Sequence, residues 1–380
     1  MQIVADENIP LIDQFFGDFG EITRLPGRTM TNEDVRDADL LLVRSVTQVT
    51  PELLEGSRVK FVGTATIGKD HIDLDYLNKH GIGFCSAPGC NAQAVVDYVM
   101  SALSVLVDTR GIGFEDLSVG IVGVGNVGLK LRQRLEQMGL TVKACDPFKS
   151  EADVGILSAL DEVLSCDVVT LHTPIEKTGE HPTWHLIGEA ELQRMKPDVC
   201  LINASRGAVI DNEALLEHLK THDDFCAILD VWENEPELNT ELLDWCALGT
   251  PHIAGYSLDG KMRGTELVYQ GACEFFGLPI RGKLAQFLPE PGIKRVNFGE
   301  QAPHYQALRT AIRAAYEIRV DDGVMRSAVR HSKDLKATFD QLRREYPLRR
   351  DTTTLRVGVP ARAHDLQAVL ENAGFDVRVK

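Results

Sequence analysis

The sequence lacks several features that would place the protein in common functional classes. It has no excess of positive charge: 40 basic and 56 acidic residues give a net charge of −16 over 380 residues. Nucleic acids and anionic membranes attract Lys and Arg, so we expect neither as a partner. No apolar run approaches the roughly 18 residues that a membrane-spanning helix needs.

Paired cysteines are also missing. The eight cysteines are scattered and form no C-x-x-C pair, the spacing that common zinc and dithiol sites use, so we predict no metal site. We expect buried, reduced thiols in a cytoplasmic protein. The first residues, 1–6, are typical of a strand and lack the charged and apolar regions of a secretion signal, which favours the same location.

Charge and composition change near residue 288. Residues 289–380 carry 17 basic and 12 acidic residues, whereas the preceding part of the chain is strongly acidic. The segment Leu-Pro-Glu-Pro-Gly at 288–292 is typical of a linker. We predict a C-terminal domain over 287–380. It has no basic run with interleaved aromatic residues, which favours a dimerisation or regulatory unit over a nucleic-acid module.

Short apolar runs alternate with amphipathic stretches before that boundary. Apolar runs bounded by turn residues are typical of buried parallel strands, and repeated βα units imply helices on both faces of the sheet. We predict an α/β protein with two doubly wound parallel-sheet domains, Rossmann- or flavodoxin-like, and a small C-terminal α/β domain. The expected strands are 3–5, 40–43, 61–63, 82–85, 118–122, 141–145, 168–172, 200–203, 227–230, 356–359 and 376–379, and helices are expected at 92–107, 306–317, 334–345 and 364–372.

A glycine motif, Gly123-Val-Gly125-Asn126-Val127-Gly128, follows the strand at 118–122 and begins a helix. The first glycine permits a tight turn, the second lets the backbone approach a pyrophosphate, and the third lets helix and strand pack closely. The helix N-terminus favours the pyrophosphate anion. Asp146 ends the next strand, where a carboxylate can bind the ribose hydroxyls and repel a 2′-phosphate. The motif therefore predicts NAD as cofactor.

The glycine motif comes after a complete series of strand–helix units, which indicates an inserted domain. We predict an NAD-binding domain over 93–256 and a discontinuous substrate-binding domain made of 1–92 and 257–286. Ligands of such folds bind at the carboxyl ends of the strands, so we expect the reaction to take place between these two domains.

Three kinds of reactive group follow later strands. Arg206 follows the strand at 200–203, where a guanidinium can bind a carboxylate through two hydrogen bonds. Two glutamates follow the strand at 227–230, and His252 lies in a turn flanked by proline and glycine. A histidine bound to a glutamate has a fixed ring and a favoured protonated form, which suits proton transfer. Each group alone is more often structural, but together with the glycine motif they favour catalysis.

In these residues the chain resembles the D-isomer-specific 2-hydroxyacid dehydrogenases. The resemblance implies that Arg206 binds the substrate carboxylate, that His252 is the acid/base and that Glu235 is its partner. The similar segments are 43–47, 62–68, 123–128, 203–207, 230–236 and 250–255, within about the first 285 residues. The resemblance also implies NAD contacts at Thr173, Ser205, Arg206, Asp230 and Gly255.

The substrate half is similar to members of that family that act on a phosphorylated acid and carry a C-terminal extension. This implies that Ser45, Thr66 and Tyr256 contact the substrate and that the extension forms a homodimer. The segments concerned are 66–71, 255–257 and 346–351. As a hypothesis, Arg349 or Arg350, or else Arg44 or Lys69, supplies positive charge for the phosphate.

Other functions remain open at this point. A phosphoglycerate dehydrogenase or another D-2-hydroxyacid dehydrogenase would share Arg206, Glu235 and His252. A non-catalytic NAD sensor, resembling the corepressors built on this fold, would need only the cofactor motif. A metal-dependent hydrolase finds little support, because no further ligand with suitable spacing accompanies His172 and Asp230.

Overall fold

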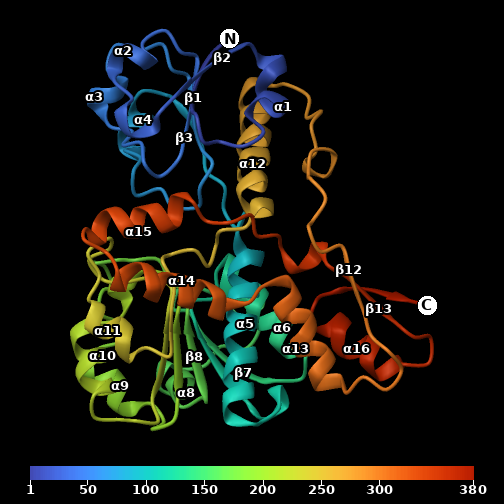
Figure 1. Cartoon of the computed structure of the whole chain (residues 1–380). Coiled ribbons are helices and arrows are strands. Elements are labelled where there is room, and N and C mark those ends of the chain that lie inside the picture. Colours follow the sequence, from blue (N-terminus) through green and yellow to red (C-terminus); the bar gives the residue numbers. More distant parts are fainter. The chain divides into compact units, whose positions relative to one another are not determined.

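The computed structural model describes all 380 residues, which form two compact units. The first unit consists of Met1–Asn91 and Ser257–Glu290, and the second of Ala92–Tyr256 and Pro291–Lys380. Each unit contains a parallel sheet with helices packed against it (Figure 1). The predicted α/β fold class is confirmed, and residues 291–380 contain a further small parallel sheet.

The first unit is built on a five-stranded parallel sheet of order β2-β1-β3-β4-β5, the flavodoxin-like order. The strands are β1 (Gln2–Asp6), β2 (Glu21–Leu25), β3 (Leu40–Val43), β4 (Phe61–Thr64) and β5 (Gly83–Cys85). The helices are α1 (Ile12–Phe16), α2 (Asn32–Val35), α3 (Pro51–Leu54), α4 (Leu74–Lys79) and α12 (Leu258–Phe276). In β3, Leu40 and Leu42 pack into one core cluster and Leu41 and Val43 into another. Side chains alternate along a strand, so this apolar run covers both faces of the sheet.

The second unit contains a six-stranded parallel sheet of order β11-β10-β9-β8-β6-β7. The strands are β6 (Ser118–Val122), β7 (Thr141–Cys145), β8 (Val168–Leu171), β9 (Cys200–Asn203), β10 (Cys226–Leu229) and β11 (Leu248–Gly249). The helices before residue 257 are α5 (Ala92–Arg110), α6 (Asn126–Gln137), α7 (Glu151–Val154), α8 (Leu160–Leu164), α9 (Glu189–Arg194), α10 (Asn212–Leu219) and α11 (Thr240–Trp245). Because all strands are parallel, their carboxyl ends lie along one edge of the sheet, where the predicted site residues follow them.

Helix α5 corrects one expectation. Its 19 residues are long and apolar enough to cross a membrane by length and composition, although no run of that kind was expected. In the structure, 83% of the apolar 18-residue stretch within this helix is buried. A helix that is covered on all sides by the core of a protein needs the same apolar composition as one that is covered by lipid.

Residues 291–380 form the third sheet, of order β12-β13-β14, and belong to the same unit as residues 92–256. Its strands are β12 (Arg295–Asn297), β13 (Arg356–Val359) and β14 (Asp376–Val379), and its helices are α13 (His304–Ala315), α14 (Ile318–Arg330), α15 (Leu335–Arg344) and α16 (His364–Asn372). The hydroxyl of Ser101 on α5 donates to the carbonyl of Tyr316 (3.0 Å) and accepts from the N–H of Ile318 (3.1 Å). These bonds join α5 to the turn between α13 and α14.

Candidate active site

The glycine motif forms the turn between β6 and α6. Gly123 has a φ of +91°, which L side chains rarely adopt, and a Cβ at Gly128 would collide with the carbonyl oxygen of Gly123. A Cβ at Gly125 would meet no atom within 4 Å, so this glycine faces open space. At the beginning of α6, Asn126 is exposed and Val127 is half-buried. This is the arrangement that a pyrophosphate needs: a tight turn, a packed helix and an open backbone between them.

Two further residues fit a dinucleotide. The Asp146 carboxylate, just after β7, accepts hydrogen bonds from the N–H groups of Val124 (2.8 Å) and Phe148 (3.0 Å), which fix it beside the glycine turn. The hydroxyl oxygen of Thr173, just after β8, is buried and has no hydrogen-bond partner. Buried hydroxyls are normally hydrogen-bonded, so this one is a position where a bound ligand would supply the partner.

Arg206 follows β9 in a turn that is fixed by the side chain of Asn203 and by close packing against Trp232. The side chain of Asn203 accepts from the Ser205 hydroxyl (2.8 Å) and donates to the Arg206 carbonyl (2.9 Å). A Cβ at Gly207 would collide with the backbone of Trp232, so glycine is required there. The Arg206 guanidinium donates to the Ser205 carbonyl (2.8 Å), and its remaining N–H groups can bind a carboxylate.

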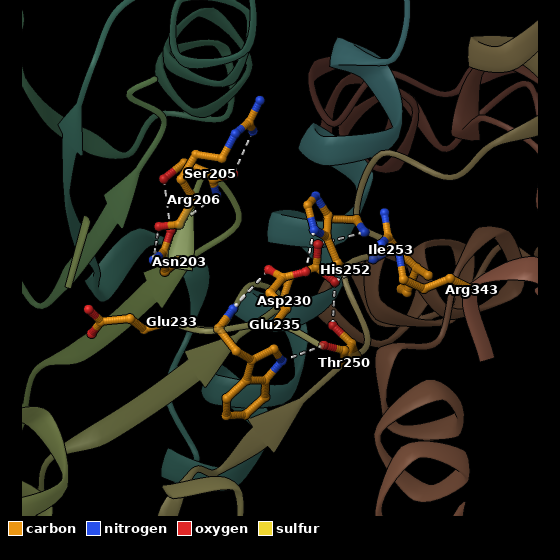
Figure 2. A network of polar contacts seen from close by, with 12 residues as sticks. Asn203, Ser205, Arg206, Asp230, Glu233, Glu235, Thr250, His252, Ile253 and Arg343 are labelled. Atoms are coloured by element: carbon orange, nitrogen blue, oxygen red, sulfur yellow. Dashed lines mark hydrogen bonds and ion pairs between the residues drawn. The ribbon is translucent and has the colours of Figure 1, made fainter. Parts of the chain in front are cut away.

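His252 follows β11 and contacts Glu235, which follows β10 (Figure 2). The Nδ1 atom of His252 lies 2.7 Å from Oε2 of Glu235, and the two side chains are 32% and 18% exposed. The backbone of His252 has a φ of +57° and its N–H donates to the Asp230 carbonyl (2.7 Å). A left-handed conformation is strained for a residue with a side chain, and such strain is common at functional sites. With Nδ1 bound to Glu235, Nε2 remains for a ligand.

The charge of Glu235 is stabilised within the site. Burial opposes ionisation of this carboxyl group, but the hydrogen bond and charge of His252, the N–H of Trp232 and the charge of Arg343 together hold its pKa below the usual value. The carboxylate is therefore ionised at neutral pH. An ionised partner fixes the orientation of the imidazole and stabilises the imidazolium when a proton arrives.

Asp230, at the end of β10, organises the turn that carries His252. Its buried carboxylate accepts from the Thr250 hydroxyl (2.7 Å) and from the N–H groups of Ile253 (2.8 Å) and Ala254 (2.9 Å). Burial raises the pKa of Asp230, although His252 and these donors act in the opposite direction. The same turn continues to the half-buried Gly255. Asp230 therefore determines the local backbone from which the imidazole projects.

The predicted substrate contacts are divided between the two units. Ser45 is exposed after β3, and Thr66 is half-buried after β4 with its hydroxyl 2.8 Å from that of Thr64. Both follow neighbouring strands of the first unit. Tyr256 ends the first segment of the second unit, and its hydroxyl accepts from Arg343 (3.1 Å). The roles of these three residues stay predictions.

Two features of the second unit were not predicted. One is a cluster in which His185 lies 2.8 Å from Glu233 and 3.5 Å from Asp211. Its two ring nitrogens face different carboxylates, so the histidine bridges two acidic side chains. One of them, Glu233, belongs to the loop that also carries Glu235, so this contact fixes the position of that loop. The other is Arg343, near Tyr256. Both bring together residues that are far apart in the chain, and no local pattern indicates them.

The half-buried His172, whose Nδ1 atom is buried, leads us to expect a stability that decreases in acid. Burial lowers the pKa of His172 from 6.5 to about 4, so the native state keeps the ring neutral while the unfolded chain takes up a proton. We expect stability to be unaffected by this group above pH 6.5 and to decrease as the pH falls towards 4, by roughly 3 kcal/mol in all. Urea unfolding of wild type and His172→Gln across this range measures the difference.

The control for this experiment is His181→Gln, which removes a histidine whose side chain is 44% exposed. That variant is expected to lose stability in acid as the wild type does, whereas His172→Gln is expected to lose less. An equal acid loss in wild type and His172→Gln would contradict the assignment.

Comparison with known proteins identifies the class. Residues 104–254 match the model of the D-isomer specific 2-hydroxyacid dehydrogenase, NAD binding domain, and residues 287–374 match a domain of unknown function (DUF3410). The structure of D-lactate dehydrogenase from Aquifex aeolicus, complexed with NAD and lactic acid, is 26% identical with a TM-score of 0.59 and covers 73% of this chain and 96% of its own. The second unit thus contains the NAD-binding domain of a D-2-hydroxyacid dehydrogenase, as the resemblance implied.

Relatives with higher sequence identity show to which family of these dehydrogenases the chain belongs. The erythronate-4-phosphate dehydrogenase of Marinobacter nauticus is 52% identical over 100% of both chains, and that of Hahella chejuensis is 49% identical, also over 100% of both. The chain belongs to the erythronate-4-phosphate dehydrogenase family. It is therefore an NAD-dependent enzyme, and its C-terminal segment is shared by these full-length relatives.

Proposed function

We propose that the protein uses NAD to oxidise 4-phospho-D-erythronate to (R)-3-hydroxy-2-oxo-4-phosphobutanoate, a step of pyridoxal 5′-phosphate (vitamin B6) biosynthesis. The observation that carries the chemistry is the contact of 2.7 Å between Nδ1 of His252 and Oε2 of Glu235, in the unit that holds the NAD motif. The choice of substrate is supported by the full-length similarity to relatives of that name.

In this mechanism His252, Glu235 and Arg206 have separate roles. The residues around the glycine turn would hold NAD, which would supply the acceptor for the hydride from C2 of the substrate. Nε2 of His252 accepts the proton of the C2 hydroxyl, and the Glu235 carboxylate stabilises the resulting imidazolium. Arg206 binds the C1 carboxylate, which orients C2 and polarises the forming carbonyl. In the reverse direction the same nitrogen of His252 returns the proton to the keto oxygen.

The residues around the glycine turn are proposed to bind the cofactor. Open backbone at the turn and the N-terminus of α6 suit the pyrophosphate, and the fixed carboxylate of Asp146 suits the ribose hydroxyls. The buried hydroxyl of Thr173 suits the nicotinamide half. The proposed set is Gly123, Gly125, Asn126, Val127, Gly128, Asp146, Thr173, Ser205, Arg206, Asp230 and Gly255.

The substrate is proposed to contact Ser45, Thr66 and Tyr256. We also propose a substrate-binding domain of residues 1–92 and 257–286, which contains Ser45 and Thr66, and an NAD-binding domain of residues 93–256, which contains Tyr256. The eight free cysteines support a reducing, cytoplasmic location.

An assay with purified protein tests the function. NADH formation is followed by absorbance with 4-phospho-D-erythronate, 3-phospho-D-glycerate and D-lactate, each with NAD and with NADP. We expect the highest kcat/KM with 4-phospho-D-erythronate and NAD. A higher kcat/KM with 3-phospho-D-glycerate would favour a phosphoglycerate dehydrogenase, and NAD binding without turnover of any acid would favour a sensor.

We also propose that residues 287–380 form a homodimer. The outer face of α14 exposes Val320 (61%) and Val324 (52%), one helical turn apart, and Leu348 beyond α15 is 82% exposed. Large exposed apolar side chains that cluster in this way are typical of protein–protein contacts.

Charge placed on this face is expected to break the dimer. Val320→Asp combined with Val324→Asp would bury two carboxylates in the interface, so we expect light scattering to show a dimer for wild type and a monomer for the double variant. Ile156→Asp, at an apolar residue that is 75% exposed outside this segment, is the control and should stay dimeric. A monomeric wild type, or a dimeric double variant, would contradict the proposal.

A further inference from the structure

Arg343 reaches from the C-terminal segment towards the predicted substrate contact Tyr256. It lies in the last turn of α15, and its Nη2 donates to the Tyr256 hydroxyl at 3.1 Å. Its Nε is buried and has no hydrogen-bond partner. A buried N–H of a charged group is costly to leave unpaired, so this atom indicates a missing acceptor.

The positive charge of Arg343 affects Glu235, the partner of His252. It is one of the groups that hold the pKa of Glu235 below its usual value, together with His252, while burial acts in the opposite direction. In the view of Figure 2, the side chains of Arg206 and Arg343 lie on opposite sides of His252. A guanidinium is therefore present on each side of the imidazole.

One other arginine of the C-terminal segment is less suited to bind a ligand. Arg349, one of the hypothesised phosphate ligands, is buried with only 6% of its surface exposed. Its guanidinium donates to the carbonyl of Ala94 on α5 and lies 3.8 Å from the centre of the Tyr316 ring. These contacts anchor the segment to α5, so we assign the phosphate to Arg343 rather than to Arg349.

We propose that Arg343, supported by Tyr256, binds the phosphate of the substrate and so determines the preference for a phosphorylated acid. This inference rests on the proposed function. A four-carbon acid with a carboxylate at C1 and a phosphate at C4 carries an anion on either side of its reacting carbon. Arg206 would bind the first anion and Arg343 the second, with C2 facing His252. A guanidinium can give a phosphate two parallel hydrogen bonds, and the free Nε–H would donate one of them.

The test compares 4-phospho-D-erythronate with D-erythronate, which lacks the phosphate. For Arg343→Gln we expect kcat/KM for the phosphorylated acid to fall about 100-fold, since a charged hydrogen bond is lost, whereas kcat/KM for D-erythronate should fall at most about fivefold, because only the support of Glu235 and Tyr256 is weakened. Arg343→Lys keeps the positive charge but loses the planar pair of N–H donors, so it should retain part of the preference for the phosphorylated acid. The affinity for NAD, measured by calorimetry, should not change in either variant.

Arg344→Gln is the matched control, because Arg344 is the next residue on α15 and its side chain is 71% exposed. It should behave as wild type with both acids. If Arg343→Gln lowers kcat/KM equally for both acids, or keeps the wild-type preference, the inference is overturned while the proposed function stands. If the wild type itself shows no preference for the phosphorylated acid, the proposed function fails and the inference fails with it.

Discussion

Replacing His252 by Gln is expected to lower kcat for 4-phospho-D-erythronate by about 10³-fold, the largest effect of any single substitution considered. An amide cannot accept the hydroxyl proton at neutral pH, and general acid–base catalysis contributes factors of this order. Binding of NAD should stay intact, since the glycine turn is formed by other residues. Steady-state NADH formation and calorimetric titration with NAD measure the two quantities separately.

Two glutamates on one loop provide the control for this prediction. Glu235→Gln removes the charge next to His252 and is expected to lower kcat about 10- to 100-fold, because the imidazolium loses its anionic partner. Glu233→Gln alters a side chain that pairs with His185 instead, at 2.8 Å, and should change kcat less than about twofold. A larger loss from Glu233→Gln than from Glu235→Gln would show that the wrong glutamate is assigned.

Arg206→Lys is expected to lower kcat/KM by about 10²- to 10³-fold, although the charge is kept. A lysine ammonium cannot form the two parallel bonds that hold a carboxylate and orient C2, so positioning is lost together with binding. Comparison of kcat with KM shows whether the transition state or only the bound substrate is affected. Arg194→Lys is the control, because Arg194 pairs with Asp161 and Glu191 on the surface. A loss confined to KM would contradict the role in orientation.

Much of the fold follows from local sequence. The strands expected at 40–43, 141–145, 200–203, 356–359 and 376–379 have the predicted bounds in the structure. A strand that is buried on both faces needs a continuous apolar run, and such a run is visible without any knowledge of its neighbours. Helix α16 was expected at 364–372 and has these bounds, since its apolar residues recur with the helical period.

The strands that were not predicted lie at the edges of their sheets. Three of the five residues of β2 are exposed, and β11 has only two residues, so neither shows a strand pattern of its own. They form because β1 and β10 offer unpaired backbone groups along one side. Helix α14 was also missed; it contains a glycine, and it buries only Ile318 and Met325.

The sequence by itself determined the cofactor turn, because a tight turn and a close helix–strand contact require glycine at fixed local spacing whatever surrounds them. It also brought Arg206, Glu235 and His252 to the ends of neighbouring strands, since parallel strands align their carboxyl ends. Only the tertiary structure decided which partner each side chain meets. His185 pairs with Glu233, 48 residues away, and Arg343 reaches Tyr256, 87 residues away. Such pairs depend on how helices and loops pack, and residue spacing carries no signal for them.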